Sequence, residues 1–165
     1  MIKTGKITFS YKEYENEDEL DSADLELIKA ARAVAANAYA PYSRFKVGAA
    51  VRLHSGRVVC GANVENAAFP SGICAERNAL STAISNYPDD KPAAISIASF
   101  TDDGITSDYP SPCGSCRQVI AEEESRIGSK IRIILSSRNK TVIVESISDL
   151  LPLQFNRNNL GFILP

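Results

Sequence analysis

Three successive segments indicate the fold class: Ala93-Ala94-Ile95-Ser96-Ile97-Ala98-Ser99-Phe100, then Pro112-Cys113-Gly114-Ser115-Cys116, then Ile131-Arg132-Ile133-Ile134-Leu135. The first and last segments are apolar runs of strand length, and residues 116–124 between them have helical character. Strand, helix and strand joined by connections longer than a hairpin predict a crossover unit on a sheet that helices cover. We therefore predict an α/β fold.

Segments on either side of this unit continue the alternation of helices and strands. The loop 54–57 predicts a hairpin between two apolar runs, and proline bounds two helical patterns. An alternating stretch near the amino terminus predicts an edge strand, and an acidic run at 13–21 predicts a solvated linker. The expected helices are 22–39 and 75–85, and the expected strands are 6–11, 47–53, 58–64 and 142–145.

Length and composition restrict the class of protein. The 165 residues suit one domain with its own core, and 44% apolar with 23% charged residues is typical of a soluble globular chain. The formal net charge of -2 supplies no general basic surface, so we do not expect a nucleic-acid polymer as partner. We find no apolar run of membrane-spanning length and no signal peptide, which predicts a cytoplasmic protein without a membrane partner.

The four cysteines are the most informative residues. In a reducing compartment such a cluster favours metal binding or redox chemistry over disulfides. Cys74, Cys113 and Cys116 stand where loops run into helices. Cys60 lies inside a predicted strand and is expected to be a small buried residue. The only histidine, His54, sits in the hairpin turn and competes poorly with three thiols as a ligand.

Three thiolates suit a catalytic zinc ion, because three protein ligands leave the fourth position of a tetrahedron to water. Cys113 and Cys116 are three residues apart and share one face of a first helical turn, whereas Cys74 comes from another helix. The helix amino termini favour thiolate over thiol. Glu76 follows a ligand by two residues, so we expect it beside the metal as the group that transfers protons.

Arg77 and Arg117 each directly follow a site residue. Three thiolates on a divalent cation carry a formal charge of -1, which weakens the acidity of the metal. A guanidinium that donates hydrogen bonds to ligand sulfur withdraws part of that charge. We expect this role for both arginines, with a surface ion pair as the alternative.

The order Cys-Ala-Glu followed by Pro-Cys-x-x-Cys resembles the three-cysteine form of the zinc deaminase signature. Four linked motifs, at their usual spacing, are similar to those of cytidine deaminases: residues 41–49, 63–67, 72–77 and 112–118. The similarity covers about residues 22–155. It implies a catalytic domain over 22–155, an amino-terminal extension over 1–21 and a tail over 156–165. It also implies a three-layer α-β-α sandwich around a five-stranded mixed sheet.

The resemblance assigns roles by matching position. It makes Cys74, Cys113 and Cys116 the ligands of one Zn²⁺ per subunit and Glu76 the proton shuttle. The ribose-binding pair would be Asn63 and Glu65, the aromatic beside the pyrimidine Phe45, and the backbone at the base edge that of Ala75 and Ser111. Phe155 would reach into a neighbouring subunit's pocket, so active sites would be shared, and the tetrameric small members of the family imply a homotetramer. Phe69 departs from the tyrosine that many members carry there.

The implied reaction is the hydrolytic deamination of cytidine and deoxycytidine to uridine and deoxyuridine, a step of pyrimidine salvage. Zinc lowers the pKa of water, and Glu76 carries protons to N3 and to the departing amine. A related aminopyrimidine nucleoside such as blasticidin S is an alternative substrate. A noncatalytic zinc module or a thiol redox protein built on Cys113 and Cys116 is an alternative of another class.

Overall fold

The computed structural model describes residues 2–161. Its strands form one mixed sheet in the order β1-β7-β6-β4-β2-β3, with β5 paired to β4. The strands are β1 (Lys12–Tyr14), β2 (Lys46–Leu53), β3 (Val58–Ala62), β4 (Pro92–Thr101), β5 (Gly104–Ile105), β6 (Arg132–Ser136) and β7 (Thr141–Val144). The α-helices are α1 (Ser22–Val34), α2 (Ala75–Asn86) and α3 (Gly114–Ile127).

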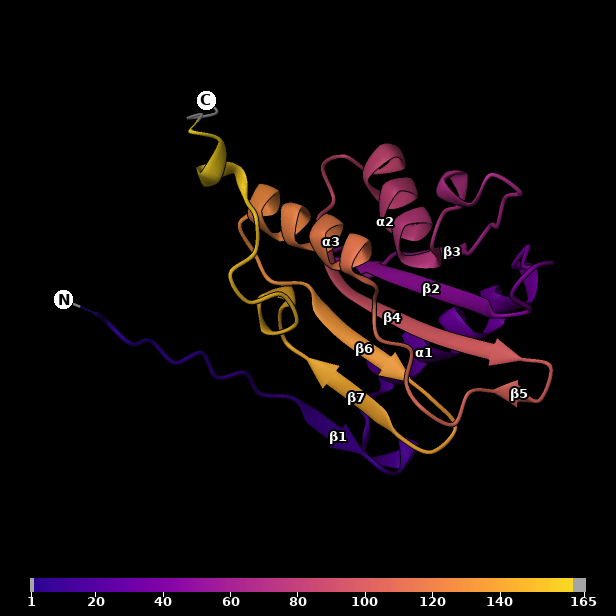
Figure 1. The fold of residues 1–165 in the computed structure, drawn as a ribbon. Helices are drawn as coiled ribbons and strands as arrows, with labels where there is room; N and C mark the ends of the chain where they lie inside the picture. The colour runs from indigo at the N-terminus through magenta and orange to yellow at the C-terminus, as the bar shows by residue number, and fades with distance from the viewer. Residues whose placement is uncertain (1, 162–165) are drawn as a thin grey trace.

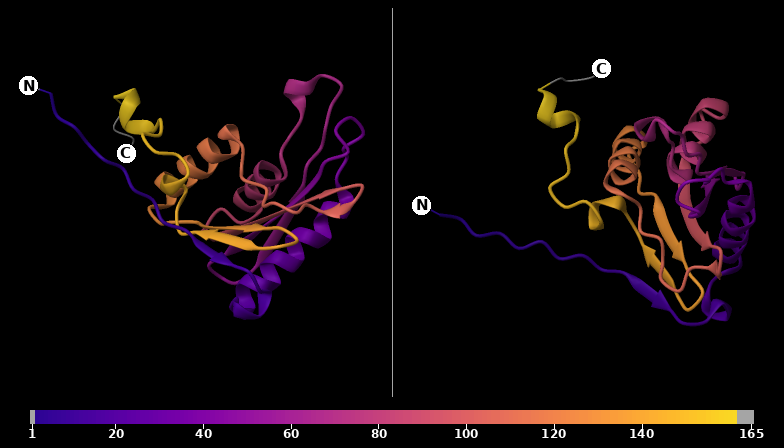
Figure 2. Two further views of the ribbon diagram at one scale, coloured as in Figure 1. Left: turned by 60° about the horizontal axis from the view of Figure 1, so that its bottom comes forward. Right: turned by 45° about the vertical axis from the view of Figure 1, so that its right-hand side comes forward.

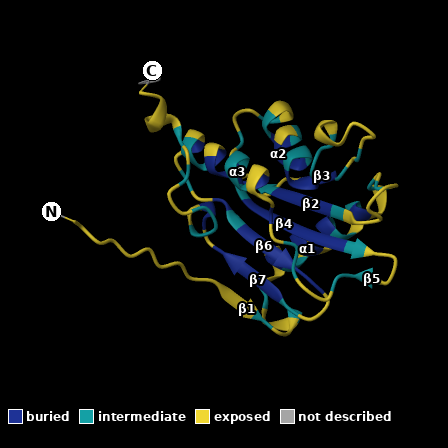
Figure 3. Cartoon of the chain, in the orientation of Figure 1, coloured by how far each residue is buried: buried dark blue, intermediate teal, exposed yellow. Residues whose placement is uncertain are grey.

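The helices lie in two layers, one on each face of the sheet (Figure 1). Alternate residues of β4 point to opposite faces, so Ile95 and Ile97 pack under α2 and α3, whereas Ala94 and Ala98 pack under α1. This alternation explains the almost continuous burial of the central strands (Figure 3). The predicted three-layer arrangement is therefore confirmed.

The sheet brings two helix starts together. β2 and β3 form the predicted hairpin, and α2 follows β3. β4 and β6 pair in parallel and are joined through α3, which is the predicted crossover unit. All other pairs in the sheet are antiparallel. Because α2 and α3 cover the same face, their first turns lie beside each other.

Two features of the predicted sheet are wrong. The sheet has seven strands instead of five, because β1 and β5 add to the five longer strands. Strand β1 also begins at Lys12, whereas the edge strand was expected over 6–11. Both extra strands are only two or three residues long and have few apolar residues, so hydrophobic patterning does not reveal them. Residues 2–11 extend away from the sheet (Figure 2).

Two glycines allow helices to pack directly on strands. A Cβ at Gly48 would lie 2.0 Å from the carbonyl oxygen of Ala31 in α1. A Cβ at Gly61 would lie 2.4 Å from the backbone nitrogen of Ala79 in α2. The absence of a side chain at Gly61 therefore sets how closely the helix that begins after Cys74 approaches β3.

Among residues 2–161, we find no helix with the length and apolar character needed to cross a membrane.

Candidate active site

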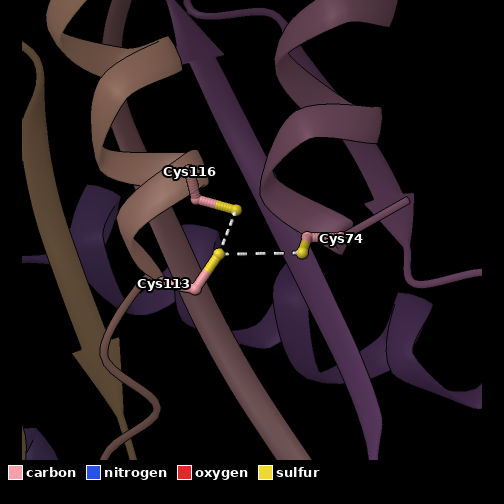
Figure 4. A group of neighbouring side chains, drawn as sticks. All are labelled: Cys74, Cys113 and Cys116. Carbon is pink, nitrogen blue, oxygen red and sulfur yellow. Dashed lines mark hydrogen bonds between the residues drawn. The ribbon is translucent and has the colours of Figure 1, made fainter. Parts of the chain in front are cut away.

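The three cysteines expected to bind metal come together at the starts of α2 and α3 (Figure 4). Cys74 is the N-cap of α2 and Cys113 is the N-cap of α3, while Cys116 lies in the first turn of α3. Cys113 Sγ is 4.0 Å from Cys74 Sγ and 3.5 Å from Cys116 Sγ. The predicted meeting of ligands far apart in sequence is thus confirmed.

The spacing and chemistry of these sulfurs fit zinc. Zinc–sulfur bonds of about 2.3 Å in a tetrahedron place sulfurs roughly 3.8 Å apart. All three sulfurs lie within 4.8 Å of one another, so a small relative movement of the side chains brings them to that spacing. No other histidine, cysteine or carboxylate of residues 2–161 joins this group. The donor set is therefore that of a zinc site with one ligand position left for a small molecule.

The thiol pKa values reflect both burial and the helix ends. Burial raises the pKa of Cys74 and of Cys116, and the charge of Glu76 adds to both effects. Burial also opposes ionisation of Cys113, but hydrogen bonds from Cys116 and from the backbone of Ser115 outweigh it and lower the Cys113 pKa. The expectation that the helix amino termini favour thiolate therefore holds for Cys113, the N-cap of α3, but not for Cys74, the N-cap of α2, where burial has the larger effect. A divalent cation would favour the thiolate form of all three.

Cys60 and His54 lie outside this cluster. His54 is exposed in the turn between β2 and β3. The prediction that Cys60 is buried is wrong, because Cys60 is exposed on β3. Strand β3 is the last strand of the sheet on its side, so an apolar run there is covered less completely than in the centre.

Glu76 is in the first turn of α2 and retains only 6% exposure. Burial raises the pKa of its carboxyl group above the ordinary value, and the nearby positive charge of Arg77 partly opposes this effect. The carboxyl lines the same cavity as Cys74 and Cys113. Its position permits exchange of protons with a molecule bound beside the sulfurs.

The guanidinium of Arg117 connects backbone segments around the metal ligands. It donates hydrogen bonds to the carbonyl of Pro112 at 2.8 Å, to the carbonyl of Leu150 at 2.6 Å and to the hydroxyl of Ser111 at 2.9 Å. These three acceptors are oxygens, so the contacts of Arg117 are structural contacts to the loop and to the C-terminal segment. The role of Arg77 and Arg117 toward ligand sulfur stays a prediction.

A cavity of about 680 Å³ opens beside the cysteines. Of the six residues expected to form the substrate site, five line it: Phe45, Asn63, Glu65, Ala75 and Ser111. Phe155 is not among the lining residues, and its side chain is 58% exposed. Its backbone carbonyl accepts a 2.8 Å hydrogen bond from Gln118 of α3. The predicted pocket residues other than Phe155 thus lie together in one chain, whereas Phe155 lies on the surface.

Glu65 is held by donors from the loop before β2. Tyr42 N donates to Glu65 Oε2 at 2.9 Å, and Ser43 N donates to the same oxygen at 3.3 Å. The Ser43 hydroxyl donates to Oε1. The Ser43 hydroxyl bond, followed by the backbone bonds from Tyr42 and Ser43, holds the Glu65 pKa below its ordinary value despite an opposing effect of burial. Glu65 is therefore an ionised acceptor at the pocket.

Asn63 fixes the backbone around the predicted base platform. Its Oδ1 accepts from Val47 N at 2.8 Å, and its Nδ2 donates to the carbonyl of Phe45 at 3.0 Å. One amide hydrogen remains for another acceptor. The side chain thus holds Phe45 in place in addition to the sugar contact predicted for it.

Sequence reasoning missed several lining residues, among them Tyr42, Ser43, Ile97 and Pro110. Ser43 lies in the motif 41–49, but its position there indicates no partner. Phe69 packs edge-on against Tyr42, with ring centroids 5.7 Å apart at 73°. Phe69 also lines the cavity and is 74% exposed, so this aromatic pair forms part of the cavity wall.

Comparison with known proteins agrees with this geometry. The chain matches the family described as cytidine and deoxycytidylate deaminase zinc-binding region over residues 21–129. It is 37% identical over 135 residues to a cytidine deaminase of Halalkalibacterium halodurans, covering 82% of this chain and 96% of the relative. It is also 26% identical over 141 residues to a blasticidin-S deaminase of Bacillus cereus, covering 84% and 96% of the two chains.

Among solved structures, the cytidine deaminase from Burkholderia pseudomallei is similar with a TM-score of 0.68 and 40% identity. That match covers 79% of this chain and 98% of the other, which confirms the predicted type of α/β fold with a mixed sheet between helices. The chain therefore belongs to the cytidine deaminase family, with Cys74, Cys113 and Cys116 as its three-cysteine zinc site.

Proposed function

We propose that the chain hydrolyses cytidine and deoxycytidine to uridine and deoxyuridine, consuming one water and releasing one ammonia, in pyrimidine salvage. One observation carries this proposal: Cys74, Cys113 and Cys116 converge beside the carboxyl of Glu76 in a cavity that also contains Glu65. The cavity volume of about 680 Å³ lies within the range of about 300–1,000 Å³ typical of small-molecule pockets.

Cys74, Cys113 and Cys116 would hold the zinc ion, whose chemistry here is to make water acidic enough to ionise near neutral pH. Glu76 accepts the proton that this water loses and passes it to N3 of the cytosine ring, while the hydroxide oxygen bonds to C4. The same carboxyl then takes the proton of the new C4 hydroxyl and delivers it to the amino group. The C4–N bond breaks, the C4 carbonyl of the product forms, and ammonia leaves. The burial of Glu76 keeps bulk water from competing for these protons.

The remaining pocket residues bind and orient the nucleoside. Phe45 lies against the pyrimidine, and the backbone of Ala75 and Ser111 meets the polar edge of the base. Glu65 accepts a hydrogen bond from a sugar hydroxyl, and the free amide hydrogen of Asn63 supports the same sugar. All five residues line one cavity, which supports this arrangement. Holding the base near Glu76 lowers the entropic part of the barrier.

A substrate panel tests the proposal. Purified zinc-loaded protein is incubated with cytidine, deoxycytidine, cytosine, deoxycytidylate and blasticidin S, and ammonia release is followed. We expect rapid release from cytidine and deoxycytidine and slow release from free cytosine, because cytosine lacks the sugar that Glu65 binds. Release of ammonia from none of these compounds would overturn the proposal. Reversible Cys113–Cys116 disulfide formation without metal would instead favour a redox protein.

Blasticidin S is the alternative substrate. The similarity to the Bacillus cereus blasticidin-S deaminase is the observation that favours it. The zinc-site chemistry is the same for cytidine and for blasticidin S. The part of the pocket that binds the sugar therefore determines which of the two is the better substrate. A kcat/KM for blasticidin S that exceeds the value for cytidine would establish the alternative.

We further propose a homotetramer with shared active sites. Phe155 is exposed while the carbonyl of the same residue is anchored to α3, so the ring is presented at a fixed place on the surface. The exposed rings of Tyr42 and Phe69 offer apolar surface at the cavity.

Sedimentation should give four chains per particle. Mixing inactive Glu76→Gln and Phe155→Ala chains should restore activity if Phe155 acts in a neighbour, and no restoration would refute sharing.

Two organisational proposals accompany this function. Residues 22–155 form the catalytic domain, with the segments 1–21 and 156–165 outside it. A cytoplasmic location fits the four free cysteines, because a reducing compartment keeps thiols available for metal. Fractionation of cells that produce the protein at native level tests the location, and recovery in a membrane fraction or outside the cell would contradict it.

A further inference from the structure

The Ser43 hydroxyl lies between two functional elements of the pocket. It donates a hydrogen bond to Glu65 Oε1 and accepts one from the backbone nitrogen of Phe45 at 3.0 Å. One oxygen atom therefore links the carboxylate proposed to bind the sugar with the residue proposed to lie against the base. The backbone N–H groups of Tyr42 and Ser43 bind only the other carboxylate oxygen, Oε2.

This division of donors determines the orientation of the carboxylate. Two backbone donors on Oε2 hold that oxygen but allow the carboxylate to pivot about it. The Ser43 hydroxyl on Oε1 removes this freedom, so both oxygens and hence the carboxylate plane are fixed. Each carboxylate oxygen accepts about two hydrogen bonds. Oε1 thus retains one acceptor position, and a hydroxyl donor of a bound sugar is the chemical group that fits it.

The backbone around Ser43 is shaped for this arrangement. The turn is closed by a 3.1 Å hydrogen bond from Arg44 N to the carbonyl of Ala40. Arg44 has a φ of 56°, a left-handed conformation that costs a residue with a side chain on the order of 1–2 kcal/mol. The left-handed conformation at Arg44 reverses the chain direction, so the backbone nitrogen of Phe45 can donate a hydrogen bond to the Ser43 hydroxyl. Backbone strain retained beside a cavity is typical of functional loops.

We propose that Ser43 is a positioning residue, which fixes the Glu65 carboxylate so that the pocket selects nucleosides carrying a 2′ or 3′ hydroxyl over 2′,3′-dideoxynucleosides. The inference rests on the proposed function and adds a residue that determines sugar selectivity. Ser43 itself needs no contact with the nucleoside. Its effect on the sugar passes through Glu65, whereas Phe45 is also held by the hydrogen bond from Asn63 Nδ2 to its carbonyl.

The test compares Ser43→Ala with wild type on cytidine and on 2′,3′-dideoxycytidine. We expect KM for cytidine to rise about tenfold, the effect of losing one hydrogen bond to a charged group, with kcat changed less than about twofold. Turnover of dideoxycytidine should change less than about twofold, because that sugar lacks the 2′ and 3′ hydroxyls that Glu65 would bind. Ser43→Thr keeps the hydroxyl and should restore most of the selectivity. Ser71→Ala, a serine outside the cavity lining, serves as control.

Binding measurements separate this inference from the proposed reaction. Calorimetry with uridine and 2′,3′-dideoxyuridine gives the same comparison without turnover, and Ser43→Ala should weaken uridine binding alone by about tenfold. A changed binding ratio in a protein without deaminase activity would support Ser43 and refute the reaction. An equal loss for both sugars, an unchanged uridine affinity, or a Ser43→Thr variant as impaired as Ser43→Ala would overturn the role of Ser43.

Discussion

Arg117 donates a 2.6 Å hydrogen bond to the carbonyl of Leu150 and so connects the helix carrying Cys116 to the C-terminal segment. The same guanidinium holds the carbonyl of Pro112, directly before Cys113. A lysine cannot reproduce these contacts, because an ammonium lacks the planar arrangement of donors. The side chain therefore couples the position of a zinc ligand to the position of the C-terminal segment that contains Phe155.

Replacement of Arg117 should destabilise the protein and its metal site together. We expect Arg117→Lys to lower the free energy of unfolding by about 2–3 kcal/mol, since hydrogen bonds of a charged group to partly buried carbonyls are lost. Denaturant titration and zinc analysis after dialysis measure the two effects. Arg138→Lys is the control, because Arg138 makes one exposed contact to the carbonyl of Asp103. Equal stability of the two variants would contradict this role.

The glycines that face the helices offer a matched pair of variants. Gly61→Ala should push α2 away from β3, displace Cys74 and Glu76, and cost about 1–3 kcal/mol. Gly48→Ala introduces a similar clash against α1 on the other face of the sheet. We expect thermal unfolding to show destabilisation in both, but kcat to fall mainly in Gly61→Ala. A larger loss of kcat in Gly48→Ala would show that the approach of α2 does not control the site.

The four cysteines should separate into two classes on substitution. Serine at Cys74, Cys113 or Cys116 should reduce bound zinc to well below one ion per chain, because the site then has only two thiolates. Cys60→Ser should keep zinc and turnover at the wild-type value, since Cys60 is exposed and outside the cluster. Zinc analysis and kinetics check both classes. Loss of zinc in Cys60→Ser would show that this thiol takes part in binding.

The pH dependence of sugar binding follows from the lowered pKa of Glu65, whose main cause is the hydrogen bond from Ser43. Because the Glu65 pKa is lowered, the carboxylate stays ionised, and able to accept hydrogen bonds, at every pH above that lowered pKa. It is protonated, and this acceptor is lost, only when the pH falls below it. Uridine affinity in wild type should stay constant from pH 7 to about pH 5. In Ser43→Ala it should begin to weaken as pH falls toward the ordinary glutamate value of about 4.3. Identical pH profiles for the two proteins would contradict this cause.

The metal cluster could be predicted from sequence because its geometry is mostly local. Cys113 and Cys116 share a helical turn, so their spacing indicates a pair of ligands. Cys74, which begins the neighbouring helix, joins them through the resemblance of Cys-Ala-Glu to the zinc deaminase signature. The main strands and helices follow from apolar periodicity in the same way. Strands β1 and β5 could not be found, because two or three residues carry no periodicity and their pairing depends on a neighbouring strand.

Other features depend on contacts between distant segments. The exposure of Cys60 follows from the place of β3 at the edge of the sheet, which the apolar run 58–64 does not reveal. The contacts of Ser43 with Glu65 and of Asn63 with Val47 join the loop before β2 to the segment after β3. Sequence motifs identify these residues as a group, but only the fold shows which side chain positions which.

Zinc content and cytidine turnover, measured together in Glu76→Gln, show whether Glu76 moves protons beside the metal. We expect this variant to bind one zinc per chain, because the three sulfurs are intact. Turnover should fall by at least about 10²–10⁴-fold, because an amide cannot carry the protons. Near-wild-type turnover with zinc bound would contradict the assignment of Glu76 as the group that moves protons beside the metal.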